Sequence, residues 1–131
     1  MNRDARLRDL SSDHHHALVL ARSIARGAMS PEEVQAAYDR SLAPHFALEE
    51  ELMLPALSHA GDTELARRTS EEHALLRAHL ARSVEDARAL QDFAELLVSH
   101  VRFEEREVFP AVERLGAVVL DRIAAAHGPR S

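Results

Sequence analysis

Two stretches of the chain repeat one chemical pattern. HFALEEELMLP at residues 45–55 and HVRFEEREVFP at residues 100–110 share a His, two adjacent Glu and a Pro at the same offsets. On a helix, a His and a Glu four positions later lie one above the other on the same face. The pairs with this spacing are His45 with Glu49 and His100 with Glu104. Imidazole and carboxylate without thiolate are typical ligands of iron, manganese or zinc, so the repeat indicates a metal site shared by two helices.

Two further histidines lie at helical spacing from apolar residues. His14 is four residues from both Leu10 and Leu18, and His73 precedes Leu76 by three residues. A single inward His is most often a hydrogen-bonded core residue, and an i,i+4 His–Glu pair often only supports a helix surface. Four inward histidines with two matched glutamates are different, because burying them is costly unless they bind something. We therefore predict six metal ligands: His14, His45, Glu49, His73, His100 and Glu104.

Capping signals and breakers indicate the helices that must position these ligands. We expect the first helix to begin at residues 11–13 and end at Gly27, after an arm of residues 1–10. Ser30-Pro31-Glu32-Glu33 is a capping box that opens a second helix, which reaches about Gly61 and is kinked at Pro44. A third helix follows from Asp62 to about residue 87, a fourth spans about 91–113, and Gly116 precedes a short terminal helix.

Apolar residues in these segments form one stripe per helix. The predicted stripes are Leu10, Leu18, Ala21 and Ala25; Leu42, Leu48, Leu52 and Ala56; Leu76, Leu80 and Val84; and Phe93, Leu97, Phe103 and Ala111. Four helices of similar length with short connections pack antiparallel. The predicted fold is therefore all-α: an up-down-up-down four-helix bundle with a short C-terminal helix, formed by residues 1–131 as a single domain.

Composition excludes several classes of function. The formal net charge of −6, with interspersed charges, gives no basic patch for nucleic acid. The charged N-terminus MNRDARLRD is unlike a secretory signal, and no uncharged run approaches the roughly 20 residues that cross a bilayer. Cysteine is absent, which removes thiolate metal sites and Cys nucleophiles. We expect a cytoplasmic protein that binds neither nucleic acid nor a membrane.

The combined motif resembles the hemerythrin-like, or HHE cation-binding, domain. The resemblance covers nearly the whole chain and rests on DHHHAL, HFALEEELMLP, EEHALL and HVRFEEREVFP. It implies an up-and-down four-helix bundle that holds a non-haem di-iron centre, with two iron ions joined by an oxo or hydroxo bridge. The resemblance also implies that Glu49 and Glu104 are bridging carboxylates and that His14, His45, His73 and His100 are terminal ligands.

Two departures from the oxygen-carrying hemerythrins bear on function. Those proteins have His-x-x-x-His in the third helix, where this chain has Arg77 after His73, and a bridging Asp where this chain has Glu105. Of roughly twelve coordination positions on two octahedral irons, about two then remain for water, substrate or another ligand. Open positions favour chemistry with O₂, hydrogen peroxide or nitric oxide, as in an oxidoreductase. The alternative is reversible O₂ or iron binding for storage or sensing; a metal-free interaction module fits the six convergent ligands poorly.

Several residues compete for the remaining positions. Glu107 and Tyr38 are expected to face inward, and one of His15 and His16 competes with His14 if the first helix is rotated. Thr69 and Ser41, four residues before His73 and His45, could orient those imidazoles. The expected partner is a small diatomic or peroxide ligand. The sequence leaves open the loaded metal, the electron donor and the oligomeric state.

Overall fold

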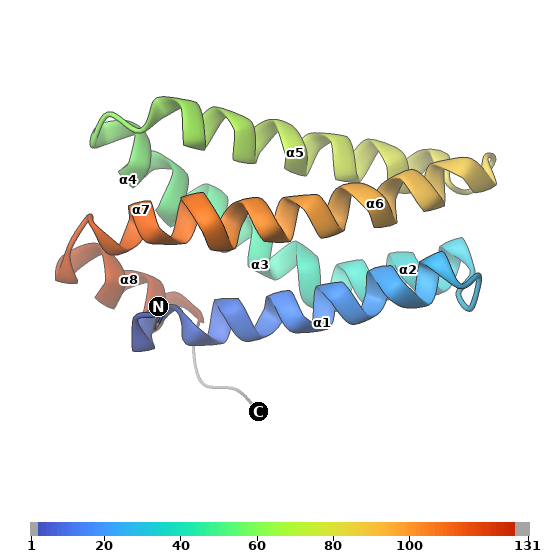
Figure 1. Ribbon diagram of the computed structural model, residues 1–131, viewed down its shortest axis with the longest axis horizontal. Coiled ribbons are helices and arrows are strands. Elements are labelled where there is room, and N and C mark those ends of the chain that lie inside the picture. Colours follow the sequence, from blue (N-terminus) through green and yellow to red (C-terminus); the bar gives the residue numbers. More distant parts are fainter. Residues whose placement is uncertain (1–2, 128–131) are drawn as a thin grey trace.

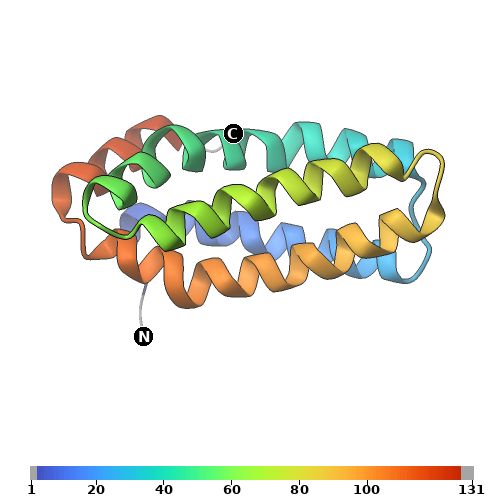
Figure 2. The same cartoon turned by 90° about the horizontal axis from the view of Figure 1, so that it is seen from above.

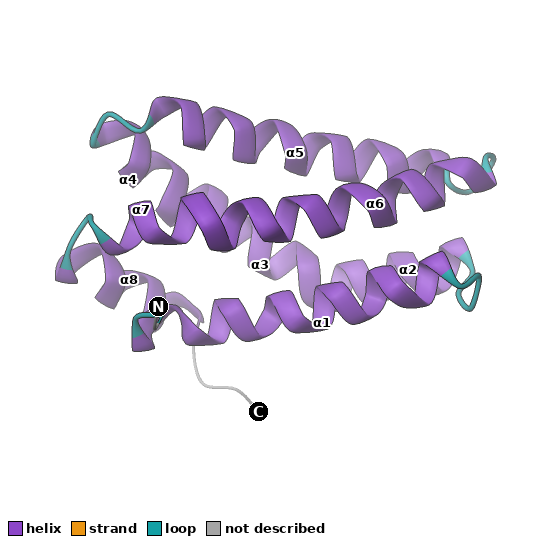
Figure 3. Cartoon of the chain, in the orientation of Figure 1, coloured by secondary structure: helices purple, strands orange, loops and turns teal. Residues whose placement is uncertain are grey.

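The computed structural model describes residues 3–127, and these residues form helices and connections with no strand (Figure 3). The predicted all-α class is confirmed. The helical segments are η1 and α1 (Ala5–Leu7, Arg8–Ala25); α2, η2, α3, η3 and α4 (Pro31–Ala37, Tyr38–Leu42, Ala43–Leu48, Glu49–Met53, Leu54–His59); α5 (Thr63–Arg82); α6, η4 and α7 (Ala87–Phe103, Glu104–Val108, Phe109–Glu113); and α8 (Ala117–His127). None of the described helices is both long and apolar enough to cross a membrane.

Long helical segments lie side by side along the molecule. Helix α6 packs between α1 and α5, and α4 packs on α5, so the fourth long segment lies beside both the third and the first (Figure 1). The terminal helix α8 turns back along the 31–59 segment and contacts η1, α3 and η3 (Figure 2). This arrangement encloses one interior to which α1, α3, α5 and α6 all contribute.

The apolar interior consists of two clusters, one toward each end of the bundle. One contains Leu7, Leu57, Phe109 and Ile123 near α8, and the other contains Ile24, Val34, Phe93 and Leu97 near the opposite end. These side chains are fully or almost fully buried. On α1 and α5, His14 and His73 fall between residues of the two clusters, and on the other two long segments the His and the Glu lie on either side of the point where one cluster gives way to the other. The polar ligands therefore form a layer with apolar packing on both sides.

Three predicted helix boundaries were wrong: the start of the first helix, the end of the third, and the start of the fourth, which is Ala87 instead of about residue 91. The first helix begins before residue 11, because Asp4 accepts a hydrogen bond from Arg6 N at 2.9 Å and opens the turn η1, which leads directly into α1. The expected arm is therefore helical over residues 5–10, and residues 1 and 2 lie outside the described part. The third helix ends at Arg82, and Asp86 caps α6 by accepting from Arg88 N at 2.9 Å. Val84 lies in this connection and is 72% exposed instead of facing the core.

The second and fourth segments pass through their prolines without breaking. Ser30 and Glu33 form the predicted capping box, with hydrogen bonds of 2.9 and 3.1 Å. Just before Pro44, where a kink was predicted, the helix widens into the π-helical turn η2, in which Ala43 N donates to Tyr38 O. The π-helical turns η3 and η4 precede Pro55 and Pro110 in the same way. A proline lacks its own N–H and crowds the preceding turn, and a widened turn accommodates both effects.

Candidate metal centre

The six predicted ligands lie together in the polar layer. His14 and His45 are 5% and 4% exposed, and the other four side chains are at most 1% exposed. Their nitrogen and oxygen atoms form two groups that could each hold a metal ion. One group contains His14, His45, Glu49 and Glu104, and the other contains His73, His100 and the same two glutamates. The structure thus brings together all six predicted ligands.

Each glutamate points one oxygen at each group. Glu49 Oε2 lies 2.9 Å from His45 Nε2, and Glu49 Oε1 lies 3.0 Å from His73 Nε2. Glu104 Oε1 lies 2.8 Å from His14 Nε2, and Glu104 Oε2 lies 3.6 Å from His100 Nε2. A carboxylate shared in this way can span two adjacent cations, as in the carboxylate sites of helical bundles. All four imidazoles present Nε2 to these oxygens.

The second group contains buried polar atoms that lack hydrogen-bond partners within the described residues. They are Glu49 Oε1, His73 Nε2, His100 Nε2 and Glu104 Oε2. The close contact between His73 Nε2 and Glu49 Oε1 does not have hydrogen-bond geometry. Buried polar atoms without partners are costly, and a cation would satisfy all four. The donor set, two imidazoles and two carboxylate oxygens per group, fits a divalent transition metal such as iron.

The outward nitrogen of every imidazole meets another carboxylate. His14 Nδ1 lies 2.5 Å from Glu105, and His45 Nδ1 lies 3.1 Å from Asp13. His73 Nδ1 lies 2.7 Å from Glu50, and His100 Nδ1 lies 2.6 Å from Glu72. When Nδ1–H donates to a carboxylate, the ring orientation is fixed and the lone pair remains on Nε2. The structure therefore holds each ring in the orientation that a metal ligand requires.

These outer contacts explain the rest of the repeated motif. In HFALEEELMLP and HVRFEEREVFP, the second Glu of each pair reaches a His on another helix: Glu50 reaches His73 and Glu105 reaches His14. On α1 and on α5, the residue just before the predicted ligand His contacts a His of the following long segment: Asp13 contacts His45, and Glu72 contacts His100. The 5–59 and 63–113 halves of the chain therefore make equivalent contacts, related by a local pseudo-two-fold arrangement.

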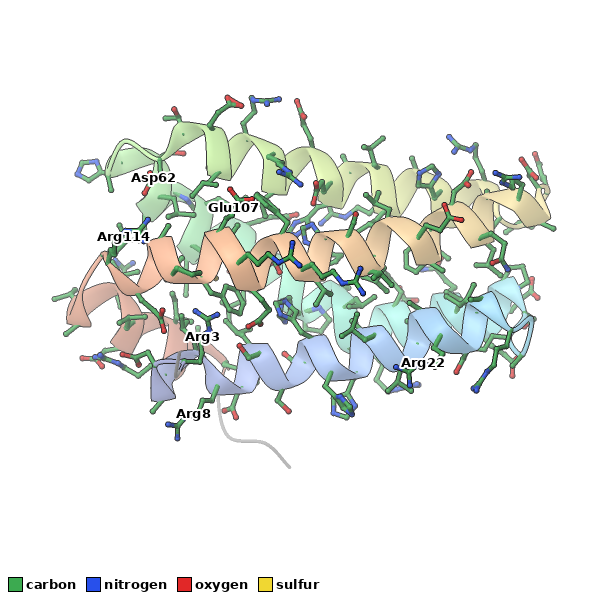
Figure 4. All side chains as sticks on the ribbon, in the orientation of Figure 1. Arg3, Arg8, Arg22, Asp62, Glu107 and Arg114 are labelled. Atoms are coloured by element: carbon green, nitrogen blue, oxygen red, sulfur yellow. The ribbon has the colours of Figure 1, made fainter. Side chains whose placement is uncertain are left out.

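Three outer carboxylates also pair with arginines. Arg3 Nη2 lies 3.2 Å from Glu105, and Figure 4 shows Arg3 between the start of α1 and the α6–α7 segment. Arg68 lies 3.0 Å from Glu72, and Arg77 lies 2.7 Å from Glu50. Arg77 occupies the offset from His73 at which oxygen-carrying hemerythrins have a His. Here its side chain is directed away from the ligand groups, to Glu50 and to the Tyr38 hydroxyl, which accepts from Arg77 Nε at 3.2 Å.

The surrounding carboxylates change the pKa of the imidazoles. Burial alone would lower the pKa of His14, but its hydrogen bonds to Glu104 and Glu105 outweigh burial and raise the pKa to about 8. Burial also opposes protonation of His45, yet Glu49 and Glu104 raise its pKa to about 10. The pKa of Glu104 is held well below its usual range despite burial, because His100, His14 and His45 face it. Without metal, protons therefore take the place of cations beside these carboxylates.

The other candidate residues lie outside the two groups. Glu107, labelled in Figure 4, is exposed on η4 instead of facing inward. It lies 3.9 Å from Arg68. His15 is exposed on α1, which retains His14 as the inward residue. Tyr38 is buried as expected, but its hydroxyl contacts Arg77. Ser41 is exposed, and Thr69 donates to Leu65 O at 2.8 Å within its own helix, so within residues 3–127 neither orients an imidazole through a hydrogen bond.

The orienting role falls to residues that the sequence interpretation did not select for it: Asp13, Glu50, Glu72 and Glu105. A sequence signal for them existed, because each acidic residue lies one position before or five positions after a predicted ligand His.

A pocket of about 730 Å³ lies between α1 and the α2–α3 part of the second segment. Its walls include Ala17, Leu20, Leu42 and Pro44, and His45 is the one predicted ligand that lines it. Asp13 and His127 lie at the same lining. The pocket therefore approaches the outer side of the His45 ring and its carboxylate partner, and Pro44 forms part of that approach.

The described residues form helices without strands and bury two His/Glu groups, so the fold and the site are those of a candidate metal-binding helical protein. The family model described as "Hemerythrin HHE cation binding domain" matches residues 5–112. The chain belongs to this family. Comparison with curated proteins and with solved structures found no significant match.

Proposed function

We propose that this protein is a non-haem di-iron protein whose centre reacts with O₂, hydrogen peroxide or nitric oxide. In this proposal the helices form the up-down-up-down bundle expected from the sequence. One ion lies with His14 and His45, the other lies with His73 and His100, and Glu49 and Glu104 bridge them. We propose iron over zinc or manganese because the chain belongs to a cation-binding family and its motif resembles that of the di-iron hemerythrins.

One observation carries the proposal: both buried glutamates divide their two oxygens between the same two pairs of imidazoles. A single-metal site would not need this division. Each group supplies two imidazole nitrogens and two carboxylate oxygens, so about two of six octahedral positions per ion remain, one for an oxo or hydroxo bridge and one for an exchangeable ligand.

The protein residues have separate roles in this chemistry. The bound iron ions would supply the redox electrons for reaction with the small ligand. The four imidazoles hold the ions through Nε2, and the outer carboxylates keep the ring protons on Nδ1. The apolar clusters on both sides exclude water from the layer, which strengthens the electrostatic contacts within it.

One observation favours the alternative, reversible O₂ or iron binding for storage or sensing without turnover. All six proposed ligands are at most 5% exposed, and a store or carrier benefits from a site closed to solvent. Both functions require a di-iron centre, and they differ in whether oxidation of that centre by O₂ is reversible.

Anaerobic loading with Fe²⁺, iron analysis and visible absorption spectroscopy test the proposal. We expect about two irons per chain, consistent with two ligand groups. Oxidation by O₂ that is not reversed when O₂ is withdrawn supports the reactive centre, and peroxide and nitric oxide consumption are then measured. A spectrum that reverses supports the alternative, and folded protein that takes up no metal contradicts both.

A further inference from the structure

Three of the four outer carboxylates have an arginine partner, and the fourth, Asp13, has a different one. His127 Nε2 lies 3.1 Å from Asp13 Oδ2, the same oxygen that lies 3.1 Å from His45 Nδ1. His127 is the last residue of α8. It lies beyond residues 5–112, which the family model matches.

Comparison of the two halves of the chain identifies the residue of α1 that corresponds to Arg68, and it is not an arginine. In the second half of the chain, Arg68 pairs with Glu72 one helical turn later on α5. The equivalent residue on α1, four before Asp13, is Asp9. An aspartate there cannot donate to Asp13, and two acids one turn apart repel each other. His127 lies beside both, with Nδ1 4.0 Å from Asp9 and Nε2 3.1 Å from Asp13.

We propose that His127 is a positioning residue of the metal centre: it holds Asp13 in place, and Asp13 fixes the ring of His45. His127 and Asp13 are only 16% and 18% exposed. In this arrangement His127 Nε2–H donates to Asp13 Oδ2, and His45 Nδ1–H donates to the same oxygen. His45 Nε2 is thereby directed to the first ligand group, beside Glu49 at 2.9 Å. This inference rests on the proposed function only for the identity of the bound group.

The packing of α8 supports this role. Leu120 and Ile123 are 2% and 0% exposed in the apolar cluster at that end of the molecule. They anchor α8 against η1, α3 and η3, which places the end of α8 beside Asp13. Through His127, the terminal helix thus holds Asp13, the carboxylate partner of His45, as Arg68 holds Glu72, the carboxylate partner of His100.

Substitution of His127 tests the proposal in the metal-free protein and in the protein loaded with Zn²⁺, a diamagnetic probe. The first readout is the exchange rate of the His45 Nδ1 proton with water, from long-range ¹H–¹⁵N spectra. The second is Zn²⁺ affinity from chelator competition. For His127→Ala we expect faster proton exchange and an affinity lower by about tenfold, the smaller end of the effect of losing an outer-shell partner.

Two conservative variants should rescue the centre. His127→Gln keeps a donor toward Asp13, and His127→Arg copies the partner that the other three carboxylates have, so both are expected near wild type. His59→Ala is the matched control, because His59 is exposed at the end of α4. Should His127→Ala fail to fold by circular dichroism, His127→Glu replaces it; its carboxylate repels Asp13, so the same losses are expected.

Wild-type exchange and affinity in His127→Ala, or in the His127→Glu variant that replaces it, would overturn the proposal. Equal losses in the Ala, Gln and Arg variants would also overturn it, since they would indicate packing and not a hydrogen bond. If wild-type protein binds no Zn²⁺ or Fe²⁺, the proposed function fails, while the exchange of His45 Nδ1 in the metal-free protein still decides the role of His127.

Discussion

Glu49 and Glu104 are the residues on which both ligand groups depend. Each faces one imidazole pair with Oε1 and the other with Oε2. Glu49→Ala or Glu104→Ala removes one oxygen ligand from each ion, so we expect these variants to retain at most one metal per chain. Metal analysis after anaerobic Fe²⁺ loading measures this. His79→Ala, outside both groups, should keep the wild-type ratio, and loss of metal in that variant alone would contradict the assignment.

The pKa values of His14 and His45 predict how metal affinity changes with pH. In the metal-free protein these pKa values are raised to about 8 and about 10, so both rings carry an extra proton at neutral pH. A metal must displace those protons. The logarithm of affinity should therefore rise by roughly two per pH unit below pH 8 and by roughly one between pH 8 and 10. Chelator competition across this range measures the slope, and a flat profile would contradict protonated rings.

The same shifts predict the stability of the metal-free protein. A raised His pKa stabilises the fold fully below the unfolded value of about 6.5, and that contribution is lost as pH rises through about 8 to 10. The lowered pKa of Glu104 acts in the opposite direction: its contribution is present above about 4.5 and is lost as pH falls. Urea unfolding of the metal-free protein should show its maximum between about pH 5 and 8.

At the residue scale, the sequence interpretation selected the inward-facing residues but not their outer partners, although each partner lies at a fixed offset from a predicted ligand His. The i,i+4 spacing and apolar neighbours selected His45, Glu49, His100 and Glu104 because those relations lie within one helix. The contacts of Glu50 with His73 and of Glu105 with His14 join different helices. They depend on how the helices are rotated against one another, which a single helical pattern does not define.

Helix α8 is the element whose contribution is easiest to isolate. Ile123 is fully buried in α8, whereas Val118 on the same helix is 74% exposed. Ile123→Ala should lower the free energy of unfolding by about 2–5 kcal/mol, through lost burial and the cavity left behind. Val118→Ala should change it by less than about 0.5 kcal/mol. Urea denaturation of both variants measures the difference, and similar values would mean that α8 does not pack as described.

Helix existence was predictable from the sequence, while some boundaries were not. Ser30, Pro31 and Glu33 form a local capping signal, which the structure contains. The connection after Arg82 has no Gly or Pro, so its only signal was the cap residue Asp86. The π-helical turns were missed as well. Glu49 and Glu104, the predicted bridging carboxylates, each begin such a turn, and a pattern at α-helical spacing does not predict where a helix widens.

At the scale of the whole molecule, metal binding and folding should be linked. The ligands come from α1, α3, η3, α5, α6 and η4, so the unfolded chain cannot present them together. With free metal at 100 times its dissociation constant, stabilisation of about 2.7 kcal/mol is expected. Anaerobic thermal unfolding with Fe²⁺ and with a chelator measures the rise in Tm. The rise should be much smaller for Glu104→Ala, and an equal rise in both proteins would indicate non-specific binding.

The single domain, the cytoplasmic location and the small diatomic or peroxide ligand stay predictions. They were inferred from chain length, composition, charge and family resemblance, and no contact or distance in the structure tests them. The all-helical class, by contrast, followed from helix-forming composition and sparse breakers, and the structure has it throughout residues 3–127.

Burial of the six ligands also has a kinetic consequence. His14 and His45 come from the first half of the chain, and His73 and His100 come from the second; each half of the chain thus carries one imidazole pair. Apolar clusters lie on both sides of the layer, and His45 is the one predicted ligand that lines the pocket beside α1, so we expect an ion to enter the finished bundle slowly. Capture would then be fastest while the two halves are still docking, and an enclosed ion would leave only as slowly as the bundle reopens.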